Sequence, residues 1–199
     1  MFNKRITLFN EQQIGEYTKP KALKVFQNIQ NIPDKEILKY RDDLSELVEK
    51  YHNESFIGGI TISFENKQNE PYFQDVSPQL KKAYVKYTVT ATGNLDLLRT
   101  CPYALNNVEM NVPCDLNDKT ISFHLDTDYY NSFDFPVKTI DNIRIKYTRV
   151  KNFIDNTSRE VNNSINHFNT TIVEHIKSEL GKRLNDAISN ENVKGKLDF

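Results

Sequence analysis

The spacing of hydrophobic residues changes twice along the chain, near residues 56 and 136, and divides it into three regions. In residues 1–56 the apolar positions recur every three or four residues, the spacing of an amphipathic helix. In residues 57–135 they recur every second residue, as in strands that bury one face. In residues 136–199 the helical spacing returns. We therefore expect a helical region, a sheet region and a second helical region, in that order.

The first region predicts two helices. The shorter covers residues 21–32, and Pro20 suits its first turn, where a backbone amide would have no partner. The longer follows Asp34, whose side chain can cap the helix by accepting a hydrogen bond from a free amide of the first turn. The apolar residues that share one face of this helix are Ile37, Tyr40, Leu44, Leu47, Val48 and Tyr51.

The second region predicts about five strands joined by short connections. The clearest is 83–91, where apolar residues alternate strictly with polar ones. Gly93 and Asn94 then signal a turn, after which the chain is expected to return as a hairpin partner. The other predicted strands are 57–65, 95–100, 108–112 and 120–126, with a polar turn at 115–118 between the last two. Because no connection is long enough for a crossover, the sheet should be antiparallel.

The third region predicts long helices, because it has no proline after Pro136 and no glycine before Gly181. Polar clusters at 156–158 and 166–171 are possible breaks. One continuous helix of about 50 residues would reach roughly 75 Å, more than a domain of this size spans, so we expect a helical hairpin. The pattern leaves open whether this hairpin packs on the sheet or projects as an oligomerisation arm.

These elements predict an α+β fold in a single module over residues 1–199. An antiparallel sheet of about five strands (57–135) would be flanked by the N-terminal helices (1–56) and the long C-terminal helical hairpin (136–199).

The amino-acid composition indicates what class of protein this is but says little about its function. Hydrophobic residues make up 38% and charged residues 27%, with a formal net charge of −1, which is typical of a soluble globular protein. The chain has no apolar run of the length of a membrane span or signal peptide, so we expect a cytoplasmic protein. Cys101 and Cys114 are too few for a disulfide scaffold or zinc site and are expected to be reduced thiols. A nearly neutral charge disfavours a general nucleic-acid binder.

One candidate metal site lies at the end of the sheet region. His124, Asp126 and Asp128 are alternate residues and so point to the same side of a strand. An imidazole with two carboxylates is a plausible ligand set for zinc or a hard cation. The alternative is that Phe123 and Leu125 fill the core while the three polar residues form the solvated face of the same strand.

A basic run in the third region is a candidate nucleic-acid contact. Its four cations are Arg144, Lys146, Arg149 and Lys151. With Tyr147 between them they can meet phosphate groups and stack on a base. On a helix, however, these cations point in several directions, which is also typical of a solvated helix surface.

Motifs for nucleophilic catalysis are missing. The sequence contains no Gly-x-Ser-x-Gly elbow, glycine-rich phosphate loop or zinc-protease helix, and neither cysteine has a histidine close by in sequence. We therefore expect no enzyme activity and no cofactor.

The C-terminal segment from Asn163 to Phe199 carries an ordered set of residues. It has an Asn, an apolar residue and a Phe-Asn pair, then an apolar residue, an arginine and paired apolar positions, then a closing Val and Leu. Here these are Asn163, Ile165, Phe168, Asn169, Ile172, Arg183, Ala187, Ile188, Val193, Leu197 and Phe199. With this pattern the segment resembles the end of an N-terminal module found in uncharacterised bacterial multidomain proteins that carry a restriction-endonuclease-like domain further along. Asp198 stands where the family has glycine.

The resemblance implies a recognition or regulatory module that precedes an effector in antiphage defence and that is part of a longer protein. The first hypothesis is therefore a non-catalytic sensor or adaptor that binds a protein or ligand, or associates with itself through the C-terminal helices. The second is a nucleic-acid-binding module that uses the basic run. The third is a metal-dependent hydrolase that uses His124, Asp126 and Asp128. We expect no membrane partner.

Overall fold

The computed structural model describes residues 4–102 and 110–197, which form two compact units. The first unit combines Met1–Ile14 with Gly58–Asn163, and the second combines Gly15–Ile57 with Ser164–Phe199. Each unit therefore joins an early and a late part of the sequence. The fold class is α+β, as predicted.

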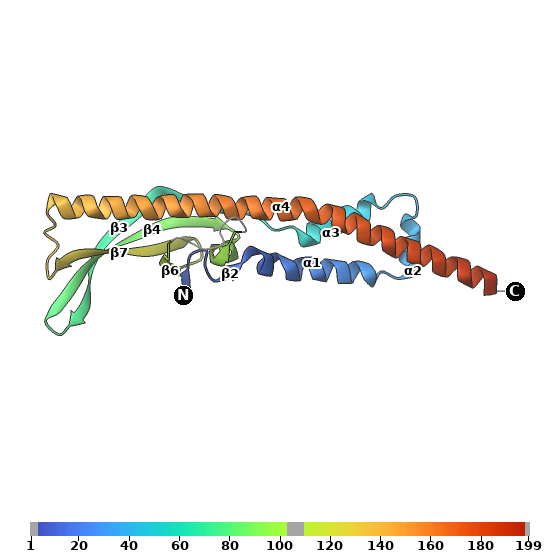
Figure 1. The fold of residues 1–199 in the computed structure, drawn as a ribbon, viewed down its shortest axis with the longest axis horizontal. Helices are drawn as coiled ribbons and strands as arrows, with labels where there is room; N and C mark the ends of the chain where they lie inside the picture. The colour runs from blue at the N-terminus through green and yellow to red at the C-terminus, as the bar shows by residue number, and fades with distance from the viewer. Residues whose placement is uncertain (1–3, 103–109, 198–199) are drawn as a thin grey trace. The chain divides into compact units, whose positions relative to one another are not determined.

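The described part of the first unit contains one antiparallel sheet of five strands (Figure 1). Their order across the sheet is β1-β6-β7-β4-β3. The strands are β1 (Lys4–Thr7), β3 (Ile60–Ser77), β4 (Leu80–Gly93), β6 (Pro113–Leu116) and β7 (Thr120–Tyr130). Two further short strands, β2 (Gln12–Gln13) and β5 (Thr100–Cys101), pair in parallel. The long β3–β4 hairpin arises because the turn after Ser77 lets the chain return directly.

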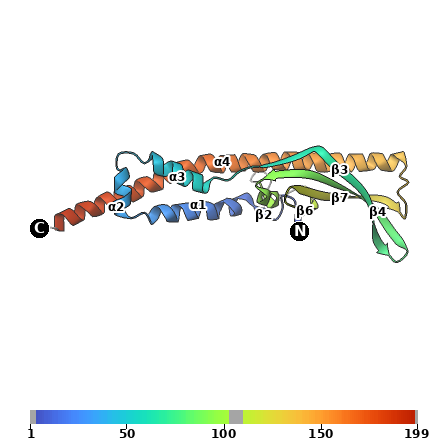
Figure 2. The ribbon, with the colours of Figure 1, turned by 180° about the vertical axis from the view of Figure 1, so that it is seen from behind.

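One face of this sheet is buried because apolar side chains alternate along its central strands. Val85, Tyr87 and Val89 of β4 lie beside Leu125, Phe123 and Ile121 of β7, and all six are buried. The first part of helix α4 (Val137–Leu197) runs along the sheet (Figures 1 and 2). Tyr147 of α4 stacks near Tyr87, with ring centroids 4.6 Å apart. The predicted hydrophobic face of the sheet is therefore covered by the third region of the sequence.

The C-terminal region is a single helix, so the predicted helical hairpin is wrong. The polar clusters do not break the helix because their side chains are satisfied within it: Ser158 donates to the carbonyl of Asp155, and Thr170 donates to the carbonyl of Asn166. The expected limit on helix length does not hold because α4 serves both units. Its residues up to Asn163 belong to the first unit, and its later residues belong to the second.

Several predicted strands differ from the structure. Residues Leu95–Arg99 form a 3-10 helix, η2, rather than a hairpin partner of β4. The reason is that Leu97 and Leu98 are both fully buried, which the alternation of a strand does not allow. Of the predicted strand 108–112, residues 108 and 109 lie outside the described residues, and 110–112 are not in a strand. Strand β6 follows instead and occupies part of the predicted turn at 115–118.

In the second unit, helices from the first region of the sequence pack with the later part of α4. They are α1 (Ile14–Gln30), α2 (Asp34–Ile37), the 3-10 helix η1 (Leu38–Tyr40) and α3 (Ser45–Ser55). The shared core includes Val25, Ile29, Ile37, Leu47, Tyr51, Ile172, Ile176, Leu180 and Leu184. The three- and four-residue spacing of these residues is what allows each helix to bury one face.

The helix starts differ from the prediction. α1 begins at Ile14 and holds Pro20 in its interior, not in its first turn. The helix expected after Asp34 is divided into α2, η1 and α3, and Asp34 makes no capping hydrogen bond. Its carboxylate instead accepts hydrogen bonds from the side chains of Arg183 and Asn190, which lie far along the sequence. The Asp34 side chain therefore forms tertiary hydrogen bonds instead of the local helix cap that the sequence predicted.

The helices of the structure can be compared with the length and apolar content of a membrane-spanning helix. Among residues 4–102 and 110–197, no helix combines the length and the apolar content that a membrane crossing requires.

Candidate functional site

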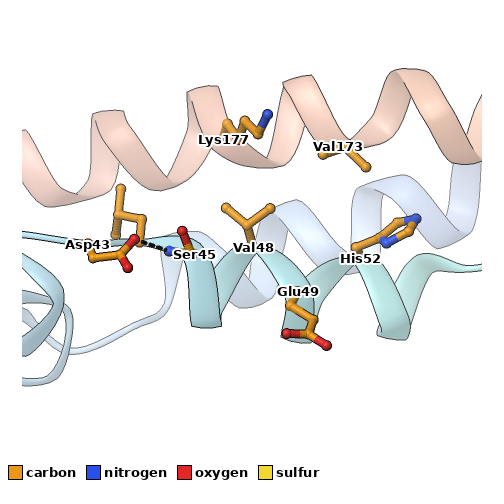
Figure 3. A pocket seen from close by; sticks show the side chains of 8 residues that line it. Asp43, Ser45, Val48, Glu49, His52, Val173 and Lys177 are labelled. Atoms are coloured by element: carbon orange, nitrogen blue, oxygen red, sulfur yellow. Dashed lines mark hydrogen bonds between the residues drawn. The ribbon is translucent and has the colours of Figure 1, made fainter.

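An open groove lies between α3 and α4 in the second unit. It consists of two adjoining hollows of about 400 Å³ and about 450 Å³, which share His52 and Val173. Figure 3 shows the first hollow, with Val48 of α3 and Val173 of α4 extending towards each other across it. The groove therefore has apolar side chains between its two helical walls.

The α3 wall follows directly from the sequence. Leu44, Val48, His52 and Phe56 are spaced every four residues, so they form one ridge along the helix. The neighbouring positions Leu47, Tyr51 and Ser55 are buried in the core. α3 thus has two adjacent stripes. One fills the core, and the other lines the groove, with Leu44, Val48 and His52 half-buried and Phe56 exposed.

Phe56 ends this ridge and is unusually open for its size. It is 55% exposed, and its ring meets the His52 ring edge to face with centroids 6.1 Å apart. A large aromatic ring at the end of an apolar groove is a feature of surfaces that bind other proteins, where such rings act as anchors.

The α4 wall is more polar. The second hollow is lined there by Asn166, Asn169, Thr170 and Glu174, and the first by Lys177. Lys177 donates to Glu174 over 2.8 Å, so these two charges largely offset each other. Asn169 is 8% exposed and is held by the backbone of Ile57, which keeps the base of the wall in place.

The α3 rim is acidic. Asp43 and Glu49 line the groove, and Glu46 lies exposed on the same helix. Hydrogen bonds from Ser45 lower the pKa of the Asp43 carboxyl, so it is ionised at neutral pH. Its Oδ1 accepts from the Ser45 amide at 2.8 Å, which starts α3 (Figure 3). The same contact breaks the longer helix expected from the sequence, because the side chain competes for a backbone amide.

A separate hollow of the same unit, outside the groove and about 470 Å³ in volume, lies beside Asp34 and Arg183. Arg183 Nε donates to the carbonyl of Ile32 at 2.9 Å, and its guanidinium also bonds to Asp34. These interactions lower the pKa of Asp34, mainly through the hydrogen bond from Arg183. Because the charges already satisfy each other, this hollow is a structural contact and a weaker binding candidate.

The predicted metal ligands lie in the first unit, on the solvent-facing side of β7, and two of them, His124 and Asp126, bind other side chains. Asp126 Oδ1 accepts from Lys146 at 2.9 Å and Oδ2 from Lys82 at 3.3 Å. These contacts lower the pKa of the Asp126 carboxyl, the Lys146 bond first. Asp128 is exposed. In the part of the chain that the structure describes, no group of three or more His, Cys, Asp or Glu side chains is arranged to hold a metal ion.

His124 belongs to a hydrogen-bonded row across the sheet that the sequence did not reveal. Its Nε2 is 3.2 Å from Asp115 Oδ2 on β6, and its Nδ1 is 3.0 Å from the Tyr72 hydroxyl on β3. Tyr72 in turn stacks on Tyr84 with ring centroids 5.5 Å apart. Strand pairing brings these residues together, so spacing along one strand cannot predict the row.

The cations of the predicted basic run, all on α4, bind different partners. Arg144 bonds to Asp141 over 3.1 Å, Lys151 pairs with Asp155, and Lys146 pairs with Asp126. Arg149 is exposed and has no ion pair among residues 4–102 and 110–197. The four cations therefore do not form one uncompensated stripe, which favours the interpretation of a solvated helix surface.

Sequence reasoning missed the groove, although its α3 ridge was visible. Leu44 and Val48 pack against the core, as the predicted helical face implies, but they are only half-buried and also line the groove. The four-residue steps from Leu44 to Phe56 were the available signal. Comparison of the chain with models of known protein families, with curated proteins and with solved structures found no match.

Proposed function

We propose that the chain is a non-catalytic recognition module that binds a segment of another protein in the groove between α3 and α4. The observation that carries this proposal is the partly accessible ridge from Leu44 to Phe56, which ends on the exposed Phe56 ring and lies opposite Val173 in the groove. Apolar grooves between two helices commonly receive an amphipathic helix of a partner. The resemblance of residues 163–199 to the front modules of bacterial effector proteins adds the expectation that such binding controls an effector.

The dimensions of the groove support a helical segment as the occupant. The ridge extends over 13 residues, from Leu44 to Phe56, which is about 18 Å along a helix. A bound helix of about 16 residues would cover it, with its own apolar side chains packed beside the ridge. The exposed ring of Phe56 would become the aromatic anchor at one end.

A displayed peptide library tests the proposal on the full chain. The library encodes amphipathic helices of about 16 residues, with aliphatic or aromatic residues on one face and Ser, Gln, Glu or Lys on the other. Selected peptides are then titrated against the wild type and against Val48→Glu and Val173→Glu. We expect each substitution to weaken binding by about tenfold or more, because it places a charge against the apolar face of the ligand.

The control is Leu23→Glu, which places the same charge on an apolar residue of the unit that lies outside the groove and is 48% exposed on α1. Its binding should equal that of the wild type. The proposal is overturned if no peptide is selected or if Leu23→Glu weakens binding as much as Val48→Glu. It is also overturned if light scattering shows a dimer that Val48→Glu dissociates, because a second copy would then fill the groove.

A further inference from the structure

The charges around the groove identify the kind of helix that fits it. Between Asp42 and Glu54 the chain carries five carboxylates and a single lysine. The carboxylates are Asp42, Asp43, Glu46, Glu49 and Glu54. Lys50 lies over the Tyr51 ring, 5.1 Å from its centroid. The preceding cation, Arg41, pairs with Glu191. The segment that contains α3 is therefore acidic although the whole chain is nearly neutral. Not all of these charges face the groove, since Glu54 accepts a hydrogen bond from Asn28 of α1.

Two of these carboxylates line the groove itself. Asp43 is at the start of α3, and Glu49 lies about two turns further along. Within residues 4–102 and 110–197, Glu49 has no ion pair. On the opposite wall the only groove-lining cation in the described residues, Lys177, is bonded to Glu174. An occupant thus meets negative charge that the module leaves uncompensated.

We propose that the occupant is a basic amphipathic helix, whose apolar face packs on the ridge from Leu44 to Phe56 while lysine or arginine side chains reach Asp43 and Glu49. This inference rests on the proposed function and specifies the chemistry of its partner. Apolar contacts supply most of the affinity. Each exposed ion pair adds about two- to fivefold, and together the pairs select the partner and its direction in the groove.

The same displayed library separates this inference from the proposed function, because it allows Glu and Lys equally on the polar face. We expect the peptides selected in a Val48-dependent manner to be enriched in lysine. A selected peptide is then synthesised with lysine, glutamine or glutamate on its polar face. The lysine form should bind most tightly at low salt and should lose affinity as salt rises, whereas the glutamine form should change little.

Charge reversal at the rim gives the decisive comparison. Glu49→Lys should weaken the lysine-faced peptide by about two- to thirtyfold, since one attraction is replaced by one repulsion, and should strengthen the glutamate-faced peptide. Glu36→Lys on α2 is the matched control, because Glu36 is likewise an exposed carboxylate but lies outside the groove. It should change neither affinity.

The outcomes are distinguishable. Val48-dependent peptides with neutral or acidic polar faces would overturn the basic partner while leaving the recognition groove intact. The basic partner is likewise overturned if Glu49→Lys and Glu36→Lys weaken the lysine-faced peptide equally. If no selected peptide depends on Val48, the proposed function itself fails.

Discussion

The side-chain amide of Asn169 pairs with both backbone groups of Ile57. Its Oδ1 accepts from the Ile57 amide at 3.1 Å, and its Nδ2 donates to the Ile57 carbonyl at 2.9 Å. Ile57 is 1% exposed and follows directly after the exposed Phe56. The pair therefore satisfies two buried backbone groups and holds the chain at the end of the groove ridge.

Substitution Asn169→Ala should destabilise the protein by about 2–4 kcal/mol, because it leaves the buried amide and carbonyl of Ile57 without partners. Urea unfolding followed by circular dichroism measures the change. Asn185→Ala is the control, since Asn185 is an exposed asparagine of the same helix. Equal effects of the two substitutions would show that the Ile57 contact contributes nothing specific.

Gly93→Ala should destabilise the first unit. Gly93 has a φ of +88°, and a Cβ there would lie 2.4 Å from the carbonyl oxygen of Gly59. The strained backbone alone costs about 1–3 kcal/mol, and the steric overlap adds to that. At Gly58 a Cβ meets nothing within 4 Å, so Gly58→Ala is the matched control. Thermal unfolding should show a clear loss for Gly93→Ala and a small change for Gly58→Ala; the reverse order would contradict the structure.

The Asp34–Arg183 pair should make stability depend on pH in the acid range. Because Arg183 lowers the pKa of Asp34 in the folded state, its contribution is fully present above the ordinary carboxyl pKa of about 4. The contribution is lost as pH falls from there through the lower, folded-state pKa. Asp34→Asn should therefore be less stable than the wild type at pH 7.

The difference between Asp34→Asn and the wild type should narrow as the pH falls below about 4. Denaturant unfolding at a series of pH values measures it. Asp186→Asn serves as the control, because Asp186 is an exposed aspartate that lines the same hollow. A difference between Asp34→Asn and the wild type that stays constant from pH 7 to below about 3 would show that Asp34 is not linked to folding through its charge.

Added Zn²⁺ or Mg²⁺ should not stabilise the protein through the His124, Asp126 and Asp128 side chains. Asp126 is bonded to two lysines, and His124 contacts Asp115 and Tyr72, so a metal ion would have to displace these partners. Thermal unfolding with and without the ions measures this. A rise in Tm that disappears in His124→Ala would instead support the metal hypothesis.

Both cysteines should resist thiol reagents in the folded state. Cys101 and Cys114 are buried, and burial raises the pKa of Cys114 to about 12, so little reactive thiolate forms near neutral pH. Labelling with Ellman's reagent at pH 8 should be slow without denaturant and should reach both thiols in urea. Rapid labelling of the native protein would contradict their burial.

The parts of the fold that were predicted correctly depend on neighbours in sequence. Alternation from Ala83 to Ala91 and in 120–126 identified the central strands, because each strand needs only a period of two to bury one face. The strand predicted over Leu95–Arg99 was wrong. Its two adjacent leucines, Leu97 and Leu98, are both buried by tertiary packing, and an alternation of buried and exposed positions cannot predict that.

The candidate site was harder to predict because local pattern does not state which of two apolar stripes finds a partner. Leu44 and Val48 share a helical period with Leu47 and Tyr51, and all four contribute to the core. Leu47 and Tyr51 are fully buried there, whereas Leu44 and Val48 are half-buried and also line the groove. Only the position of α4 beside α3 determines which residues of this face stay partly accessible.

By itself, the sequence determined the α+β class, the central strands and the helical character of residues 137–197, since each follows from periodicity over a few turns or pleats. Tertiary structure decided that Asp34 bonds to Arg183, that His124 bonds to Asp115, and that α4 continues without a break. These outcomes depend on residues distant in the chain. A charged or polar side chain forms hydrogen bonds and ion pairs with groups that lie within reach, and only the folded chain determines which groups those are.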